Sequence, residues 1–297
     1  MAADDAFFRT LEVTVSAAGV DWARLGLTSA TVSLAYGDRR HDLHFTPASH
    51  GDQSWRVFRD AGQGDSYSYR VTYHFDPGSP WHAPRSDHTL PERGSSARHL
   101  VIDPAADFTF VEVEVVPGRL DPAEIRAVEV KLHYDDGRGW SRDDQLVVEP
   151  GSDPQSWCLR LEGRAPTSYR YALAHQLVAG PTIELAPVTA PAGRLVVRDP
   201  FAGALELTIL PRFDPARVRV AVVDVHYEDP TNHYTRDLRA SFDGRSMAPV
   251  RQRLGLRDPA RTRFSVRTTL VNHDGTMSQS EFVPTTNTRI AVGEGGT

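Results

Sequence analysis

The feature that most constrains this chain is an alternation of apolar and polar residues with a period of two. In residues 67–75 every odd position is aromatic or aliphatic, and every even position is polar. Residues 169–173 and 264–270 carry apolar side chains at matching alternate positions. Successive side chains of a strand point to opposite faces, so this pattern is typical of strands with one buried and one solvated face. The sequence therefore predicts an all-β chain of antiparallel strands.

The alternating segments belong to a unit that occurs three times. Each copy contains a strand-like run that ends in a tyrosine, and these tyrosines, Tyr36, Tyr134 and Tyr227, lie 98 and 93 residues apart. Ser54-Trp55 in the first copy returns 102 residues later as Ser156-Trp157 in the second. A period of this length is that of a small domain. We expect both tryptophans, Trp55 and Trp157, to lie in the cores of their copies.

The repeats divide the 297 residues into domains at 1–104, 105–200 and 201–297. Each holds about seven short strand-like runs bounded by Gly, Pro, Asp and Ser, as expected for a β-sandwich. The linkers, residues 103–107 and 199–203, are short and contain proline but no Gly/Ser tract. Such linkers favour a semi-rigid row of three sandwiches. Three domains folded back on one another are the alternative.

The repeats resemble the immunoglobulin and fibronectin type III class of β-sandwich. The resemblance rests on a Tyr-x-Tyr-x-Val strand, followed by a Gly-containing turn and another strand, in units of about 95 residues. The Cys-Trp-Cys pattern of immunoglobulin domains is absent, and Thr262 and Phe264 replace the paired tyrosines in the third copy. The resemblance implies a fold of tandem sandwiches. It implies no activity, because such folds carry many unrelated functions.

Composition excludes several classes of protein. A net charge of -6 argues against a nucleic-acid-binding protein. The single cysteine excludes a disulfide framework and a cysteine-based zinc site. No apolar run approaches the length of a membrane span, and residues 1–5 lack the basic and apolar character of a secretion signal. We therefore expect a cytoplasmic protein, or part of an assembly built in the cytoplasm, with no membrane contact.

The sequence contains no pattern typical of a catalytic or metal site. The 12 histidines show no HExxH or similar spacing, and neither a GxSxG motif nor a phosphate-binding Gly-rich loop occurs. A joint calcium site built from Asp103, Asp107 and Asp199 is an alternative, but these carboxylates are too few for calcium. Alternation points Cys158 outward, without a basic neighbour to activate its thiol. We predict no enzyme activity, cofactor or metal.

Charge indicates one candidate docking surface. The three copies carry net charges of -3, -5 and +2. Five arginines of the third copy occupy alternating positions on what we take to be two neighbouring strands, so their guanidinium groups are expected to share one sheet face: Arg251, Arg253, Arg261, Arg263 and Arg267. Such a face fits an acidic protein partner, including the middle domain of a second copy of the chain. A solvated face that prevents association is the alternative.

Three tryptophans that do not recur leave a different possibility open. Trp22, Trp81 and Trp140 each stand beside Gly, Pro, Asp or His in an expected loop. Indoles in loops can stack on sugar rings, and residues 133–140 are loosely similar to starch-binding sandwich modules. Indoles that cover the ends of the sandwiches or a joint between them are the other interpretation. These three residues are therefore candidate glycan-stacking residues.

Together these features predict a non-enzymatic structural or interaction protein. A semi-rigid row of three sandwiches would act as a scaffold, spacer or docking subunit of a larger assembly, with protein partners that include self-association. A carbohydrate-binding module array is the alternative function.

Overall fold

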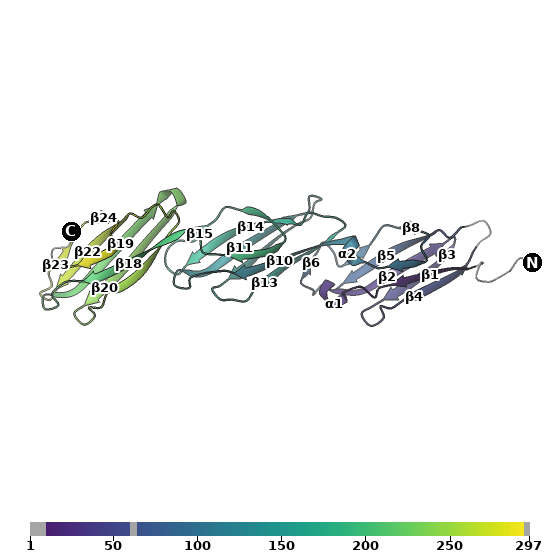
Figure 1. Cartoon of the computed structure of the whole chain (residues 1–297), viewed down its shortest axis with the longest axis horizontal. Helices are drawn as coiled ribbons and strands as arrows, with labels where there is room; N and C mark the ends of the chain where they lie inside the picture. The colour runs from purple at the N-terminus through teal and green to yellow at the C-terminus, as the bar shows by residue number, and fades with distance from the viewer. Residues whose placement is uncertain (1–9, 60–63, 294–297) are drawn as a thin grey trace, which may run out of the picture.

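The chain forms three β-sandwiches that follow one another in a row (Figure 1). This computed structural model describes residues 10–59 and 64–293. Six sheets account for its strands. The predicted all-β class with three tandem sandwiches of the immunoglobulin and fibronectin type III kind is confirmed. The domain limits at 104/105 and 200/201 stay a prediction.

The first unit consists of a smaller and a larger sheet. The smaller has the order β4-β1-β9, with β1 (Thr10–Ser16), β4 (Gln53–Phe58) and β9 (His99–Val101). The larger has the order β3-β2-β5-β7, and β8 also pairs with β5. Its strands are β2 (Leu27–Tyr36), β3 (Arg39–Phe45), β5 (Tyr67–Phe75), β7 (Asp87–Thr89) and β8 (Arg93–Ser95). A single turn of helix, α1 (Trp22–Leu25), joins β1 to β2.

The middle unit follows the same plan after the short helix α2 (Pro104–Asp107). Its smaller sheet contains β10 (Phe108–Pro117), β13 (Gln155–Glu162) and β17 (Gly193–Val197), together with β6 (Trp81–His82) from the first unit. Its larger sheet contains β11 (Ile125–Asp135), β12 (Ser141–Val148), β14 (Ser168–Leu177), β15 (Ile183–Glu184) and β16 (Val188–Pro191).

The third unit repeats the arrangement once more. Its smaller sheet contains β18 (Gly203–Pro211), β21 (Val250–Leu256) and β25 (Arg289–Val292). Its larger sheet contains β19 (Val218–Asp229), β20 (Tyr234–Asp243), β22 (Phe264–Asn272), β23 (Met277–Gln279) and β24 (Val283–Thr285). The 3-10 turn η2 (Pro230–Asn232) connects β19 to β20.

One strand pair in each unit departs from the expected antiparallel arrangement. The closing strands β9, β17 and β25 pair in parallel with the opening strands β1, β10 and β18. In each unit the closing segment leaves the edge of the larger sheet and crosses to the smaller one. It then runs in the same direction as the opening strand.

The recurring tyrosines have one structural role. Tyr36, Tyr134 and Tyr227 lie at or within two residues of the end of the second strand of their units and are fully buried. Each phenol donates a hydrogen bond to a backbone carbonyl in the segment before β5, β14 or β22, at 3.0, 2.7 and 3.0 Å. A buried phenol requires a hydrogen-bond partner, and here the partner holds a crossing between the two sheets. This explains the 98 and 93 residue spacing.

The apolar cores extend across the joints. The core of the first unit includes Phe108, the first residue of β10. The cores of the middle and third units form one continuous cluster of buried residues. Neighbouring units therefore share buried apolar surface.

We expect Tyr134→Phe to lower the free energy of unfolding by about 1 kcal/mol, because the Pro166 carbonyl loses its donor. Chemical denaturation of the full chain measures this change. Tyr171→Phe is the control, because the partly buried Tyr171 makes no hydroxyl hydrogen bond among the described residues. Equal losses in the two variants would contradict the role assigned to the phenol.

Candidate functional site

The first joint is closed by a strand that the first unit contributes to the middle unit. β6 belongs to the connection between β5 and β7, yet it pairs in parallel with the edge strand β13, Trp81 opposite Cys158. The Trp81 ring is buried, and its edge packs against Phe110 at 5.0 Å between ring centroids. Its Nε1 donates to the carbonyl oxygen of Arg24 at 2.8 Å. One unit thus completes a sheet of the next.

The middle unit contributes an aromatic side chain in return. Phe108 packs edge-on against Tyr73 and Phe75, with ring centroids 5.3 Å apart in both pairs. The neighbouring Asp107 is buried and accepts hydrogen bonds from the Tyr73 hydroxyl at 2.7 Å and from Arg93 Nη2 at 2.8 Å. Burial and the nearby Asp107 carboxylate raise the pKa of Tyr73, so its phenol stays a donor. The two units are interlocked in both directions.

Two further polar side chains are buried at this joint. The Arg160 guanidinium lies 3.5 Å from the centre of the Phe75 ring and donates to the Arg85 carbonyl at 3.1 Å. Burial lowers the pKa of Arg160 to about 10. His88 has Nε2 at 3.1 Å from the same carbonyl and Nδ1 at 3.3 Å from Glu162 Oε2. Burial lowers the pKa of His88 although its hydrogen bond to Glu162 acts to raise it.

The second joint rests on a buried ion pair. Arg236 of β20 places Nη2 3.4 Å from Glu124 Oε2, and the two side chains are 6% and 4% exposed. Arg253 Nη1 lies 3.2 Å from Asp121 Oδ2 in a half-exposed pair beside it. Burial raises the pKa of Glu124, and the positive charge of Arg236 opposes that shift. Gly180 gives the Arg236 side chain room, because a Cβ there would lie 3.2 Å from Nη1.

Tyr234 of the third unit lies close enough to interact with both charges of this ion pair. Tyr234 is buried, and its ring centroid lies 5.7 Å from that of Phe201. Phe201 requires glycine beneath it, because a Cβ on Gly255 would lie 2.8 Å from its ring. Nε and Nη1 of Arg236 and the hydroxyl of Tyr234 are buried without a hydrogen-bond partner among the described residues. The stability of the joint is therefore sensitive to any substitution that places a hydrogen-bond acceptor beside these unpaired groups.

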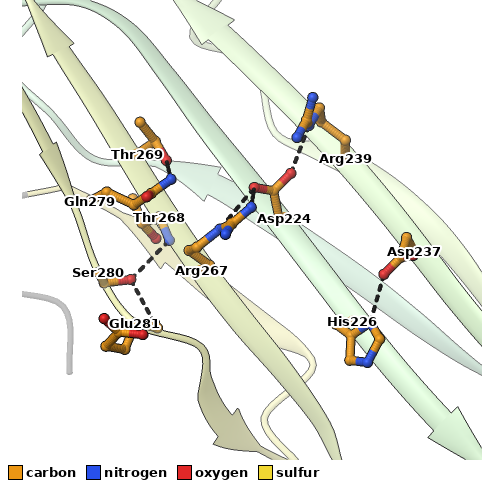
Figure 2. A network of polar contacts seen from close by, with 10 residues as sticks. All are labelled: Asp224, His226, Asp237, Arg239, Arg267, Thr268, Thr269, Gln279, Ser280 and Glu281. Carbon is orange, nitrogen blue, oxygen red and sulfur yellow. Dashed lines mark hydrogen bonds and ion pairs between the residues drawn. The ribbon is translucent and has the colours of Figure 1, made fainter.

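The outer face of the larger sheet in the third unit carries a network of charged residues (Figure 2). Asp224 of β19 accepts hydrogen bonds from Arg239 Nε at 2.6 Å and from Arg267 Nη2 at 2.9 Å. Burial acts to raise the pKa of Asp224, but these hydrogen bonds lower it. The Arg267 guanidinium also lies 4.6 Å from the centre of the Phe282 ring. The carboxylate is thus held between cations from the two flanking strands.

A histidine on the same face is held by two carboxylates. His226 Nδ1 lies 2.7 Å from Asp237 Oδ1, and Nε2 lies 2.9 Å from Glu228 Oε1. These hydrogen bonds raise the pKa of His226. His133 and Asp143 form the equivalent cross-strand pair in the middle unit, at 2.7 Å.

The five candidate docking arginines do not share one face, so that prediction is wrong. Arg251 and Arg253 lie on β21 in the smaller sheet, Arg267 lies on β22 in the larger sheet, and Arg261 and Arg263 lie in the segment between those strands. The chain changes sheets in this segment, which the alternation does not reveal. Arg253, Arg261 and Arg267 are paired with carboxylates of the same chain. A docking role for these arginines stays a prediction.

The glycan-stacking residues are mostly inaccessible. Trp22 is 7% exposed within the core of the first unit, and Trp81 is 7% exposed at the first joint. Both are therefore closed to a sugar ring, and the prediction is wrong for them. Trp140 is partly exposed and packs against Tyr134 at 6.0 Å between centroids. Trp55 and Trp157 are buried in their cores as expected.

Alternation predicts that the Cys158 side chain points outward, and the exposure expected from that position is wrong. Its neighbours Trp157 and Leu159 are buried in the core, and Cys158 itself, opposite Trp81 in the β13-β6 pair, is only 5% exposed. Burial raises the pKa of its thiol to about 11. A strand added from another repeat leaves no mark in the alternation of β13 itself.

Within residues 10–59 and 64–293 no group of three or more His, Cys, Asp and Glu side chains is placed to hold a metal ion. None of the helices in the same ranges is long and apolar enough to cross a membrane.

Comparison with known proteins gives only distant similarities. No family model matches the chain, and no curated protein matches it. The Bacillus anthracis TIE protein has 10% identity and a TM-score of 0.25, and the match covers 97% of this chain and 51% of that one. This chain thus spans about half the length of the TIE protein structure.

Two further structures show the same level of similarity. A Streptococcal ancillary pilin has 11% identity and a TM-score of 0.28, over 96% of this chain and 98% of that one. The FN1-FN3 domains of chicken CNTN1 have 8% identity and a TM-score of 0.17, over 88% of both chains. These scores are too low to support a functional inference, and the architecture rests on the strand pairing described above.

We expect acid to weaken the first joint through His88. Its pKa is lowered from 6.5 in the folded chain, so the unfolded chain takes up this proton first and stability is lost as pH falls below about 6.5. His88→Gln keeps a donor and removes the titration. Unfolding measured at pH 7.5 and 5.5 should show a smaller pH-dependent loss in this variant than in the parent chain. The exposed His99→Gln is the control, and an undiminished loss in His88→Gln would refute the assignment.

We expect the free energy of unfolding to fall more when one member of the Arg236–Glu124 pair is replaced than when both are replaced. Arg236→Met leaves Glu124 buried without its cation and should cost about 3 kcal/mol of unfolding free energy. Arg236→Met combined with Glu124→Leu removes both charges and should recover most of that loss. Denaturation of the single and double variants measures the coupling. Additive losses would show that the pair does not act as a unit.

Proposed function

We propose that this chain is a non-enzymatic structural protein whose three sandwiches form a stiff spacer. The observation that carries the proposal is the reciprocal insertion at the first joint. The middle unit receives β6 in its smaller sheet, and the first unit receives Phe108 in its core. Relative motion of these two units would break backbone hydrogen bonds and expose buried aromatic surface. Flexible linkers impose no such cost.

The second joint supports the same proposal by a different chemistry. Bending there would separate Arg236 from Glu124 and Arg253 from Asp121. A buried charge that loses its partner is strongly destabilising. The two joints together would hold the ends of the row at a fixed separation, as a spacer, scaffold or docking subunit requires. Protein partners, including a second copy of the chain, would then bind along its faces and edges.

A stiff first joint can be measured with spin labels. We expect labels at Asp52→Cys and Asp153→Cys, exposed residues of adjacent units, to give a narrow distance distribution by double electron-electron resonance. The buried Cys158 thiol has a pKa raised to about 11, which keeps it from reacting with the label. Trp81→Ala removes the indole that anchors β6 and should broaden the distribution.

Trp140→Ala is the matched control, because it removes an indole that packs on Tyr134 of its own unit and has no hydrogen bond or ring contact with the first unit among the described residues. It should leave the distribution narrow. A broad distribution in the parent chain would refute the spacer. An equal effect of the two tryptophan substitutions would show that β6 does not control the joint.

A further inference from the structure

The outer face of the larger sheet in the middle unit contains an open hollow of about 650 Å³. This volume is within the usual range of about 300 to 1,000 Å³ for ligand sites. Strands β11, β12 and β14 line it, and Pro187 between β15 and β16 lines it as well. Its charged and polar lining residues include the cations Lys131 and Arg170 and the neighbouring His133, Asp143, Asp144 and Gln145; Asp144 is bonded to Arg142.

The hollow exists because one side chain is short. In the middle unit Ala172 stands opposite Lys131 in the β11-β14 pair. The equivalent residues of the other units are arginines, Arg70 and Arg267, counted from the aligned tyrosine and phenylalanine that begin β5 and β22. Each of those arginines lies across the sheet face and pairs with a carboxylate of its own unit, at 3.5 and 2.9 Å. The methyl group of Ala172 leaves that space open.

The hollow also presents a cation that its own unit does not neutralise. Arg170 is exposed and has no ion-pair partner among the described residues. It is the diagonal neighbour of Lys131 on the same face, a spacing that long side chains can bridge. Lys131 Nζ lies 3.6 Å from Glu129, and the two side chains are 53% and 20% exposed. Asp143 is already bonded to His133.

The third unit shows how a carboxylate fits on this kind of face. Asp224, the equivalent of Lys131, accepts hydrogen bonds from Arg239 and Arg267 on the two flanking strands (Figure 2). The middle unit has Lys131 and Arg170 on the corresponding face, where Arg170 has no ion-pair partner among the described residues and Lys131 lies 3.6 Å from Glu129. A carboxylate supplied from outside would complete the arrangement.

We propose that this hollow binds the carboxylate side chain of an acidic segment of a partner protein. The carboxylate would lie between Arg170 and Lys131, and an adjacent apolar group would contact Ala172 and Pro187. This deepens the proposed function by naming a partner chemistry. The binding test is independent of the spacer test, because the hollow lies within one unit and does not require a stiff joint.

The test uses the full chain and a fluorescein-labelled hexaglutamate peptide as the probe. Fluorescence anisotropy at low salt should show binding that weakens as salt rises. Arg170→Ala should weaken it about tenfold, because a charge-assisted hydrogen-bond donor is lost. Ala172→Arg should have a similar effect, because it fills the hollow with the residue type found in the other two units.

Arg70→Ala is the matched control, because it removes an exposed arginine from the corresponding face of the first unit. It should leave the affinity unchanged. Equal losses in Arg70→Ala and Arg170→Ala, or no loss in Ala172→Arg, would overturn the proposal. Binding of a labelled galacturonate hexamer in the absence of hexaglutamate binding would also overturn it, since the partner would then be an acidic sugar. Circular dichroism confirms that each variant is folded.

Discussion

The exchange of β6 and Phe108 across the first joint is the interaction on which the arrangement of the row depends. Each unit alone has the two sheets and the alternating core expected of a sandwich. The exchange connects the first two units, because backbone hydrogen bonds and aromatic contacts cross from one unit to the next. The same contacts bury Arg160, His88 and Cys158, and thereby set the low pKa values of the first two and the inert thiol of the third.

Different residues and a different kind of contact connect the units at the second joint. Its contacts are a buried ion pair between Arg236 and Glu124 and a partly exposed pair between Arg253 and Asp121. Such a pair contributes little net stability compared with apolar packing, but it penalises any geometry that separates its members. The same repeated sandwich is therefore connected in two ways: by an added strand at the first joint and by ion pairs at the second. In the proposed spacer, both joints would limit bending of the row.

Much of the fold could be predicted from the alternation and the repeats, whereas most of the site could not. Tyr36, Tyr134 and Tyr227 mark equivalent positions, and the structure gives them the same hydrogen bond. Alternation identifies which side of a strand faces the core, but not which sheet the strand joins, so the five arginines were wrongly placed together. It also cannot show that β6 pairs with β13 at the first joint, where Trp81 and Cys158 are both buried.

Small-angle X-ray scattering of the full chain in solution tests the stiff row most directly. A single extended shape with three units in line, unchanged between low and high salt, is the result that this account requires. Salt should have little effect, because the contacts that hold the joints are buried and poorly screened. A scattering curve that can be fitted only by a mixture of extended and folded-back arrangements would contradict the account.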